Sequence, residues 1–279
     1  MTSMEVRKKL TVSLSTWFCL PDKGMMDMEI LCRASAFVVK SSSQGYKNKL
    51  HVVTASHNVA PWRFPKIYPE EWLQCINEKN THYTIEIRHP DGMFMTQTEL
   101  LPISYHHSSR DLAVLHLEAD LVGLDTFTRL GYDHHNLSTR TLKSGENLMF
   151  EGFQIASSST GNFGGNDGGD ASTNDADIRL PVPSVIPGTF VSQEMYQQFA
   201  RTYHKINHAM SGGPVISTPL KASSSATPAT RGRTAVKVGA VPVDRGEVCG
   251  MLEGVVPEDS EDVENRGMVS FVDSDTILE

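Results

Sequence analysis

The sequence lacks an excess of positive charge. Its 279 residues include 25 Lys and Arg against 33 Asp and Glu, which gives a formal net charge of -8. A nucleic-acid-binding chain needs a basic surface to attract the phosphate backbone. Nucleic acid is therefore not expected as the principal partner.

Cysteines are scarce, and long apolar runs are missing. Four cysteines, without CxxC or finger spacing, favour a reducing intracellular compartment, cytoplasmic or organellar. No apolar run reaches the length that crosses a bilayer, so we predict no membrane span. Near the N-terminus, residues 6–21 place a basic cluster before a short apolar run, which is either a weak targeting signal or an ordinary packing segment.

Sustained helical periodicity is also missing, whereas short β-branched runs separated by polar turns are frequent. Residues 32–59 predict a hairpin with His57 just past its second strand, and residues 82–106 predict another around a Pro-Asp-Gly turn. Residues 61–80 predict an inserted loop with a short helix, and residues 192–206 a helix or a helix running into a strand. The pattern indicates an antiparallel all-β barrel or sandwich.

Two stretches have low complexity, near residues 155–178 and 220–234. Both consist mainly of small and polar residues. Such segments bury too little apolar surface to offset the entropy of ordering, so we expect disordered insertions.

Three polar residues stand in strings that favour nucleophilic chemistry. His57 ends HVVTASH, Asp111 opens DLAVLHL and Ser211 starts SGGPV. Amide hydrolysis by a serine requires a base for the hydroxyl proton and a carboxylate that orients the base. The glycines after Ser211 have no Cβ and permit a sharp turn close to a substrate. Each residue alone is more often structural, but together they predict a catalytic triad.

The order His, Asp, Ser in these strings resembles the chymotrypsin-like (trypsin-fold) serine peptidases of the PA clan, most closely the HtrA/Deg protease domain. INHAMSGGPV resembles the family's INPGNSGGPL, and IEIRHPDGMF and SSRDLAVLHL resemble its second hairpin and aspartate strand. The likeness covers roughly residues 32–278 without the two insertions. It implies an all-β fold of two six-stranded antiparallel β-barrels with a few short helices. The implied division is an N-terminal segment 1–30, a first barrel 31–120, and a connector and second barrel 121–279.

The resemblance also implies a function. The chain is expected to be a serine endopeptidase that hydrolyses extended or unfolded polypeptides through an acyl-enzyme on Ser211, with no cofactor. His57 is implied as the general base, and Asp111 as the group that holds its tautomer. The amides of Ala209 and Ser211 are implied as the oxyanion hole. The implied substrate-binding residues, on an edge strand and a specificity pocket, are Ile206, Leu252, Glu253, Gly254 and Ser270.

Departures from the family pattern bear on activity and activation. Ala209 stands where the family has glycine, and its Cβ disfavours a backbone with positive φ. Met210 replaces the aspartate that pairs with a new N-terminus in digestive trypsins, and Asn58 replaces a disulfide cysteine. The last two departures point to an intracellular protease without a zymogen step.

A second class of function stays open beside the peptidase. A catalytically impaired trypsin-fold protein would use the cleft or the loops as a protein-binding or scaffold module. The chain ends just after the expected second barrel, so we expect no PDZ domain of the kind that many HtrA proteins carry. The resemblance is compatible with a homo-oligomer, because HtrA relatives are often trimers.

Other residues that could bind metals or act as nucleophiles have weaker contexts. His204 and His208 stand four apart, but no HExxH motif accompanies them, so we expect no metal site. Cys75 and Cys249 lie in no activating motif and are interpreted as small core residues.

Overall fold

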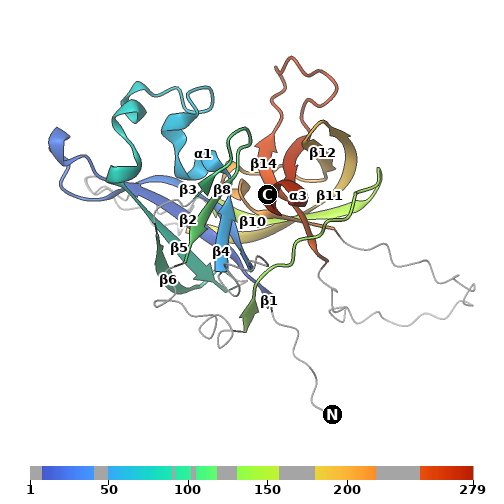
Figure 1. Ribbon diagram of the computed structural model, residues 1–279, viewed down its shortest axis with the longest axis horizontal. Helices are drawn as coiled ribbons and strands as arrows, with labels where there is room; N and C mark the ends of the chain where they lie inside the picture. Colours follow the sequence, from blue (N-terminus) through green and yellow to red (C-terminus); the bar gives the residue numbers. More distant parts are fainter. Residues whose placement is uncertain are drawn as a thin grey trace, which may run out of the picture.

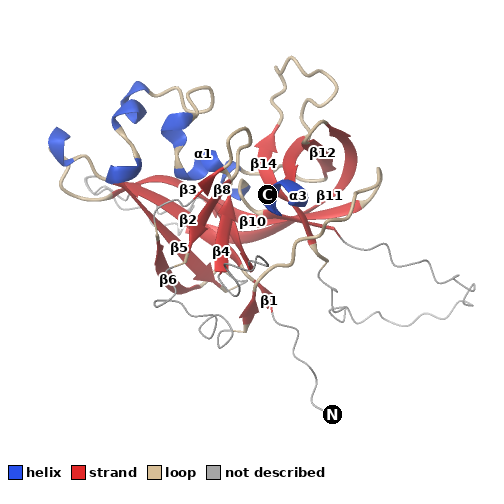
Figure 2. Ribbon diagram, in the orientation of Figure 1, coloured by secondary structure: helices blue, strands red, loops and turns tan. Residues whose placement is uncertain are grey.

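The computed structural model describes residues 8–40, 50–89, 92–101, 105–117, 131–156, 180–217 and 246–278. The chain is mostly β-structure, with an open sheet from the first half beside a barrel from the second half (Figure 1). Figure 2 shows that the helices are short and that most of them gather along one margin of the first sheet. Among the described residues, no helix combines the length and the apolar character needed to span a membrane.

The first half forms a seven-stranded sheet in which every neighbouring pair is antiparallel. Its order is β6-β5-β2-β3-β4-β8-β7. The strands are β2 Thr11–Phe18, β3 Glu29–Lys40, β4 Leu50–Thr54, β5 Thr81–Arg88, β6 Phe94–Leu100, β7 Tyr105–His106 and β8 Ala113–His116. Both predicted hairpins are confirmed as the pairs β3/β4 and β5/β6.

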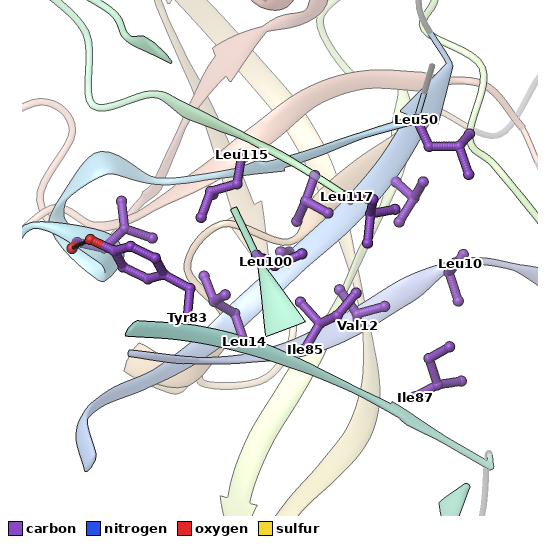
Figure 3. Packing of buried hydrophobic residues seen from close by; sticks show 14 of the residues in the cluster. Leu10, Val12, Leu14, Leu50, Tyr83, Ile85, Ile87, Leu100, Leu115 and Leu117 are labelled. Carbon is purple, nitrogen blue, oxygen red and sulfur yellow. Dashed lines mark hydrogen bonds between the residues drawn. The ribbon is translucent and has the colours of Figure 1, made fainter. Parts of the chain in front are cut away.

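Strand β2 lies inside this sheet, between β3 and β5. Its residues Val12 and Leu14 point into the main core of the first half together with Ile85 and Leu115 (Figure 3). This alternation of apolar residues explains which face of the strand packs into the core. The sequence is compatible with either a targeting signal or a packing segment here. In the structure, residues 11–18 form a strand of the sheet.

The second half closes into a six-stranded antiparallel barrel, in the order β10-β11-β12-β15-β14-β13. Its core contains three aromatic rings, Phe150, Phe190 and Phe271, of which Phe271 lies edge-on to the other two. The strands are β10 Asn147–Ala156, β11 Leu180–Glu194, β12 Gln197–Thr202, β13 Pro214–Ser217, β14 Val248–Val255 and β15 Val269–Asp273.

The structure thus has one closed barrel, and the second predicted barrel is not confirmed. In the first half the two ends of the sheet approach each other only through an isolated bridge between Leu100 and Leu117 and a 3.1 Å hydrogen bond from the Leu101 amide to the His116 carbonyl. One bridge is not a ladder, and β7 has only 2 residues. The described strands therefore form an open sheet.

The remaining elements are short. Strands β1 and β9 form a separate parallel pair. The bounds are β1 Lys8–Lys9, β9 Tyr132–Asp133, α1 Ser56–Val59, α3 Ser274–Leu278 and the 3-10 helices Pro21–Lys23, Pro61–Arg63, Glu71–Cys75, Glu78–Asn80 and His208–Met210.

The helix expected within residues 192–206 is wrong. This segment contains the end of β11, a tight turn and strand β12. Met195 takes a left-handed backbone, with φ 51°, at the turn. The strand pairing within the barrel outweighs the helical propensity of the glutamines and alanine.

The insertion 61–80 packs against the first sheet through a separate apolar cluster. Its Leu73 and Ile76 are buried against Phe18. The short helix expected there is confirmed as the 3-10 helix Glu71–Cys75. The two low-complexity segments, near 155–178 and 220–234, lie almost entirely outside the described residues.

A buried carboxylate before β10 gives the fold a testable pH dependence. Arg140 hydrogen-bonds to both oxygens of Glu146, at 2.9 Å for one of them, and this contact holds the Glu146 pKa below its ordinary 4.5. The stabilisation is present above pH 4.5 and is lost as the pH falls through the lowered folded-state pKa. At pH 7, Glu146→Gln should lower the free energy of unfolding by about 1 kcal/mol, a small value because solvent reaches Arg140.

Urea denaturation at neutral and acidic pH measures this difference. The exposed Glu261→Gln serves as the control for loss of a surface charge. A Glu146→Gln deficit that stays constant down to about pH 3 would show that the ion pair is not its source.

Candidate active site

Helix α1 presents His57 immediately after strand β4 ends at Thr54. The His57 backbone amide donates to Asp111 Oδ1 at 2.9 Å, and its Nδ1 hydrogen-bonds to Asp111 Oδ2. The other ring nitrogen, Nε2, lies 3.1 Å from Ser211 Oγ. Both nitrogens of one imidazole are therefore engaged, by a carboxylate on one side and a hydroxyl on the other.

The sheet pairing brings Asp111 to this position. Strands β4 and β8 are antiparallel with Thr54 opposite Ala113, so the residues that follow β4 lie beside those that precede β8. His57 stands three residues after Thr54, and Asp111 two residues before Ala113. Local pairing alone thus joins two of the three predicted residues.

Ser211 comes from the second half, on the turn before β13. Its carbonyl accepts the Ser35 amide at 3.1 Å and the Asn58 side-chain amide at 3.0 Å. Both donors belong to the first half, so these bonds hold the turn against the open sheet. The Asn58 side chain therefore provides a non-covalent contact between the two halves.

Gly212 permits this close approach. Its φ is +84°, and a Cβ there would lie 2.2 Å from Thr54 Oγ1 and 2.3 Å from the Ser35 carbonyl oxygen. No other residue type combines that backbone with that space. The glycine after Ser211 is thus required by the packing of the two halves.

The amides predicted for the oxyanion hole are both engaged within the chain. The Ser211 amide donates to the His208 carbonyl at 3.0 Å, and the Ala209 amide donates to Asn207 Oδ1 at 3.0 Å. The Ala209 carbonyl accepts the Ser35 hydroxyl at 2.7 Å. These bonds form a 3-10 turn in which the His208 carbonyl faces the donor that a developing oxyanion would need.

Ala209 fits this turn because it needs no positive φ. Among the described residues other than glycine, only Met195 has a positive φ. Glycine at this position would allow the neighbouring peptide to rotate at less cost. Ala209 is therefore compatible with this closed conformation of the turn.

Glu253 lies beside the nucleophile on β14. Ser211 Oγ is 2.7 Å from the Glu253 carbonyl oxygen, so the hydroxyl has two alternative acceptors, this carbonyl and His57. Burial raises the pKa of the Glu253 carboxyl, and the Gln197 amide that donates to it at 2.8 Å opposes that shift. Nearby Asp111 raises the pKa further, whereas Arg110 and His57 lower it.

The other predicted substrate-binding residues lie in different surroundings. Ile206 and Leu252 are buried in the barrel core. Ser270 is also buried, on β15, whereas Gly254 is half-buried at the surface. The structure thus brings Glu253 next to Ser211, while Ile206 and Leu252 pack with the apolar residues of the barrel.

Sequence reasoning missed two rings that contact the histidine. Phe64 and Tyr68, from the insertion 61–80, have ring centroids 6.0 Å and 6.2 Å from that of His57. Tyr68 also hydrogen-bonds to Cys32, and burial raises the pKa of both, that of Cys32 to about 11. The only signal in the sequence was the insertion itself, which follows the histidine directly.

Ser56 was also missed. Its hydroxyl hydrogen-bonds to His106 Nδ1, which ties the helix that carries His57 to strand β7. Burial lowers the pKa of His106, which favours the neutral imidazole. A neutral imidazole with its proton on Nε2 can accept a hydrogen bond from the Ser56 hydroxyl.

No group of three or more His, Cys, Asp or Glu residues within the described part of the chain could hold a metal ion. The described cysteines are all free; Cys249 is buried, which raises its pKa to about 12, whereas Cys75 is exposed rather than a core residue.

No family model and no curated protein matches this chain. The fold and the site therefore rest on the chain's own geometry. The chain is mostly β-structure with one closed six-stranded barrel, which is compatible with a trypsin-like fold. Asp111, His57 and Ser211 form a hydrogen-bonded series between the two halves.

Proposed function

We propose that this protein is a serine endopeptidase that hydrolyses extended polypeptides through an acyl-enzyme on Ser211. One observation carries the proposal: a single imidazole joins the Asp111 carboxylate to the Ser211 hydroxyl, the latter at 3.1 Å. A nucleophile, a base within hydrogen-bond reach and a group that orients the base are the parts that this chemistry requires.

The chemical steps follow from these three residues. His57 Nε2 takes the Oγ proton as Oγ bonds to the substrate carbonyl carbon, and Asp111 remains ionised beside the imidazolium. The C–N bond then breaks, and the leaving amine takes the proton from Nε2. Water next attacks the acyl carbon while Nε2 accepts its proton. The bond between Oγ and the acyl carbon then breaks, Oγ takes the proton from Nε2, and the acid product leaves.

The end of β14 supports the choice of an extended substrate, because the ladder between β13 and β14 ends at Met251, before Glu253. The Glu253 carbonyl lies 2.7 Å from Ser211 Oγ, so a peptide attacked by that oxygen brings its own N–H groups next to the same carbonyl. Strand addition of this kind is a common way to bind extended peptides.

Catalysis also requires donors for the oxyanion. Rotation of the peptide between His208 and Ala209 would release the Ser211 amide and direct the Ala209 amide to the same point. One such donor is worth about 10² to 10³ in kcat. We infer that substrate binding opens the turn, and that the free protein is latent.

A second function, a binding or scaffold module without catalysis, is favoured by the same closed turn. If the turn does not open, the triad remains without oxyanion donors. The two functions differ in whether Ser211 reacts.

Labelling of the purified protein with a fluorophosphonate probe tests the proposal. We expect slow labelling, because the turn of the free protein is closed, and we expect that labelling to disappear in Ser211→Ala and in His57→Ala. Because glycine permits the rotated turn, Ala209→Gly should label about tenfold faster. Ser211→Ala in the Ala209→Gly background is the control for labelling elsewhere.

Two results would favour the binding module instead. One is a folded wild-type protein that is inert to the probe even with Ala209→Gly. The other is labelling that survives Ser211→Ala.

A further inference from the structure

A guanidinium, an aromatic ring and a carboxylate gather next to the triad without a role in it. Arg110 immediately precedes Asp111, Tyr196 lies in the turn between β11 and β12, and Glu253 lies beside Ser211 on β14. The Arg110 guanidinium carbon is 4.3 Å from the centroid of the Tyr196 ring, a cation-π contact between the two halves.

The Glu253 carboxylate lacks a direct cationic partner. Its hydrogen-bond donor is the neutral amide of Gln197, at 2.8 Å, and no lysine or arginine of the described ranges forms an ion pair with it. The charged groups that act on it are Asp111, which is repulsive, and Arg110 and His57, which are attractive. A partly desolvated carboxylate in this setting gains stability from an added cation.

The surface beside Glu253 is open at Gly254. Strand β14 is irregular between Leu252 and Gly254, and a Cβ at Gly254 would meet nothing within 4 Å. Tyr196 is 60% exposed, so its ring can be reached from solvent. The nearby Glu253 carbonyl, 2.7 Å from Ser211 Oγ, places this surface along the path of a substrate backbone.

We propose that the Glu253 carboxylate and the Tyr196 ring form a subsite for a lysine or arginine side chain of the polypeptide substrate. The proposal rests on the proposed function and adds a substrate class to it. Arg110 covers the Tyr196 ring in the free protein, and a substrate cation takes its place. An apolar side chain would bury the carboxylate without a partner, so the subsite discriminates against it.

Binding to Ser211→Ala protein tests the subsite without hydrolysis. The probes are two fluorescein-labelled decapeptides of alanine, serine and valine that differ at one central position, lysine in one and norleucine in the other. By fluorescence anisotropy, we expect the lysine peptide to bind about tenfold more tightly.

Substitutions test which residues produce the preference for the lysine peptide. In the Ser211→Ala background, Glu253→Gln should abolish the lysine preference, because the amide keeps the size and loses the charge. Glu258→Gln, on the exposed segment after the same strand, is the matched control and should retain it. Tyr196→Ala should weaken binding of the lysine peptide, whereas Arg110→Ala should strengthen it by vacating the ring.

Equal binding of the two peptides, or a lysine preference that survives Glu253→Gln, would overturn the subsite. Weaker lysine binding in Arg110→Ala would overturn the displacement of Arg110. Failure of the wild-type protein to react with the fluorophosphonate bears on hydrolysis alone, because the binding assay does not use Ser211 as a nucleophile.

Discussion

If the proposed function is right, replacing Asp111 by asparagine should lower kcat about 10⁴-fold, the size of the effect that the equivalent change has in well-characterised triad proteases. Asp111 accepts from both the backbone amide and the Nδ1 of His57. An asparagine presents an amide NH₂ in place of one oxygen, which favours the imidazole tautomer with its proton on Nε2. That nitrogen then cannot accept the Ser211 proton.

Hydrolysis of fluorescein-labelled casein, as a generic unfolded substrate, measures the effect. Asp133→Asn is the matched control, because Asp133 also contacts a histidine, His134, outside the site. We expect the control to retain wild-type kcat. A loss of less than about tenfold in Asp111→Asn would remove Asp111 from the mechanism.

The second large effect concerns stability. Gly212→Ala should lower the free energy of unfolding by about 3 kcal/mol or more, the sum of a left-handed backbone and a crowded Cβ. The added carbon would meet Thr54 Oγ1 at 2.2 Å and the Ser35 carbonyl at 2.3 Å. Neither neighbour can move freely, because Thr54 donates to that carbonyl at 2.8 Å.

Gly24→Ala separates the two contributions. Gly24 has nearly the same backbone, φ +82°, but a Cβ there would meet nothing within 4 Å. Its alanine variant should therefore lose only about 1 to 2 kcal/mol. Urea denaturation of both variants gives the comparison, and equal losses would show that crowding between the two halves contributes nothing.

Local patterns were enough for part of the fold. Alternation of apolar and polar residues predicted the hairpins β3/β4 and β5/β6, because strand pairing between adjacent segments depends mostly on local residues. Residues 192–206 were misjudged, since barrel pairing decided their conformation. The second predicted barrel came from family resemblance, and the described strands of the first half do not close it.

The candidate site also has a part that the sequence predicts and a part that it does not. His57, Asp111 and Ser211 could be singled out in advance because each stands in a distinctive string, and the structure brings their side chains together. The contacts of Tyr68 with His57 and of Tyr196 with Arg110 could not be predicted, because each joins segments whose approach depends on the whole fold.

Residue types alone indicate which residues carry the candidate chemistry and in what order they occur. Local alternation of apolar and polar residues indicates the strands that end beside them. Only the tertiary structure decided the direction of the Ser211 and Ala209 amides and the surroundings of the Glu253 carboxylate. Peptide direction and desolvation are set by neighbours from distant parts of the chain, here Ser35, Asn58 and Gln197. The effect of a single residue such as Ala209 on the site therefore depends on those contacts.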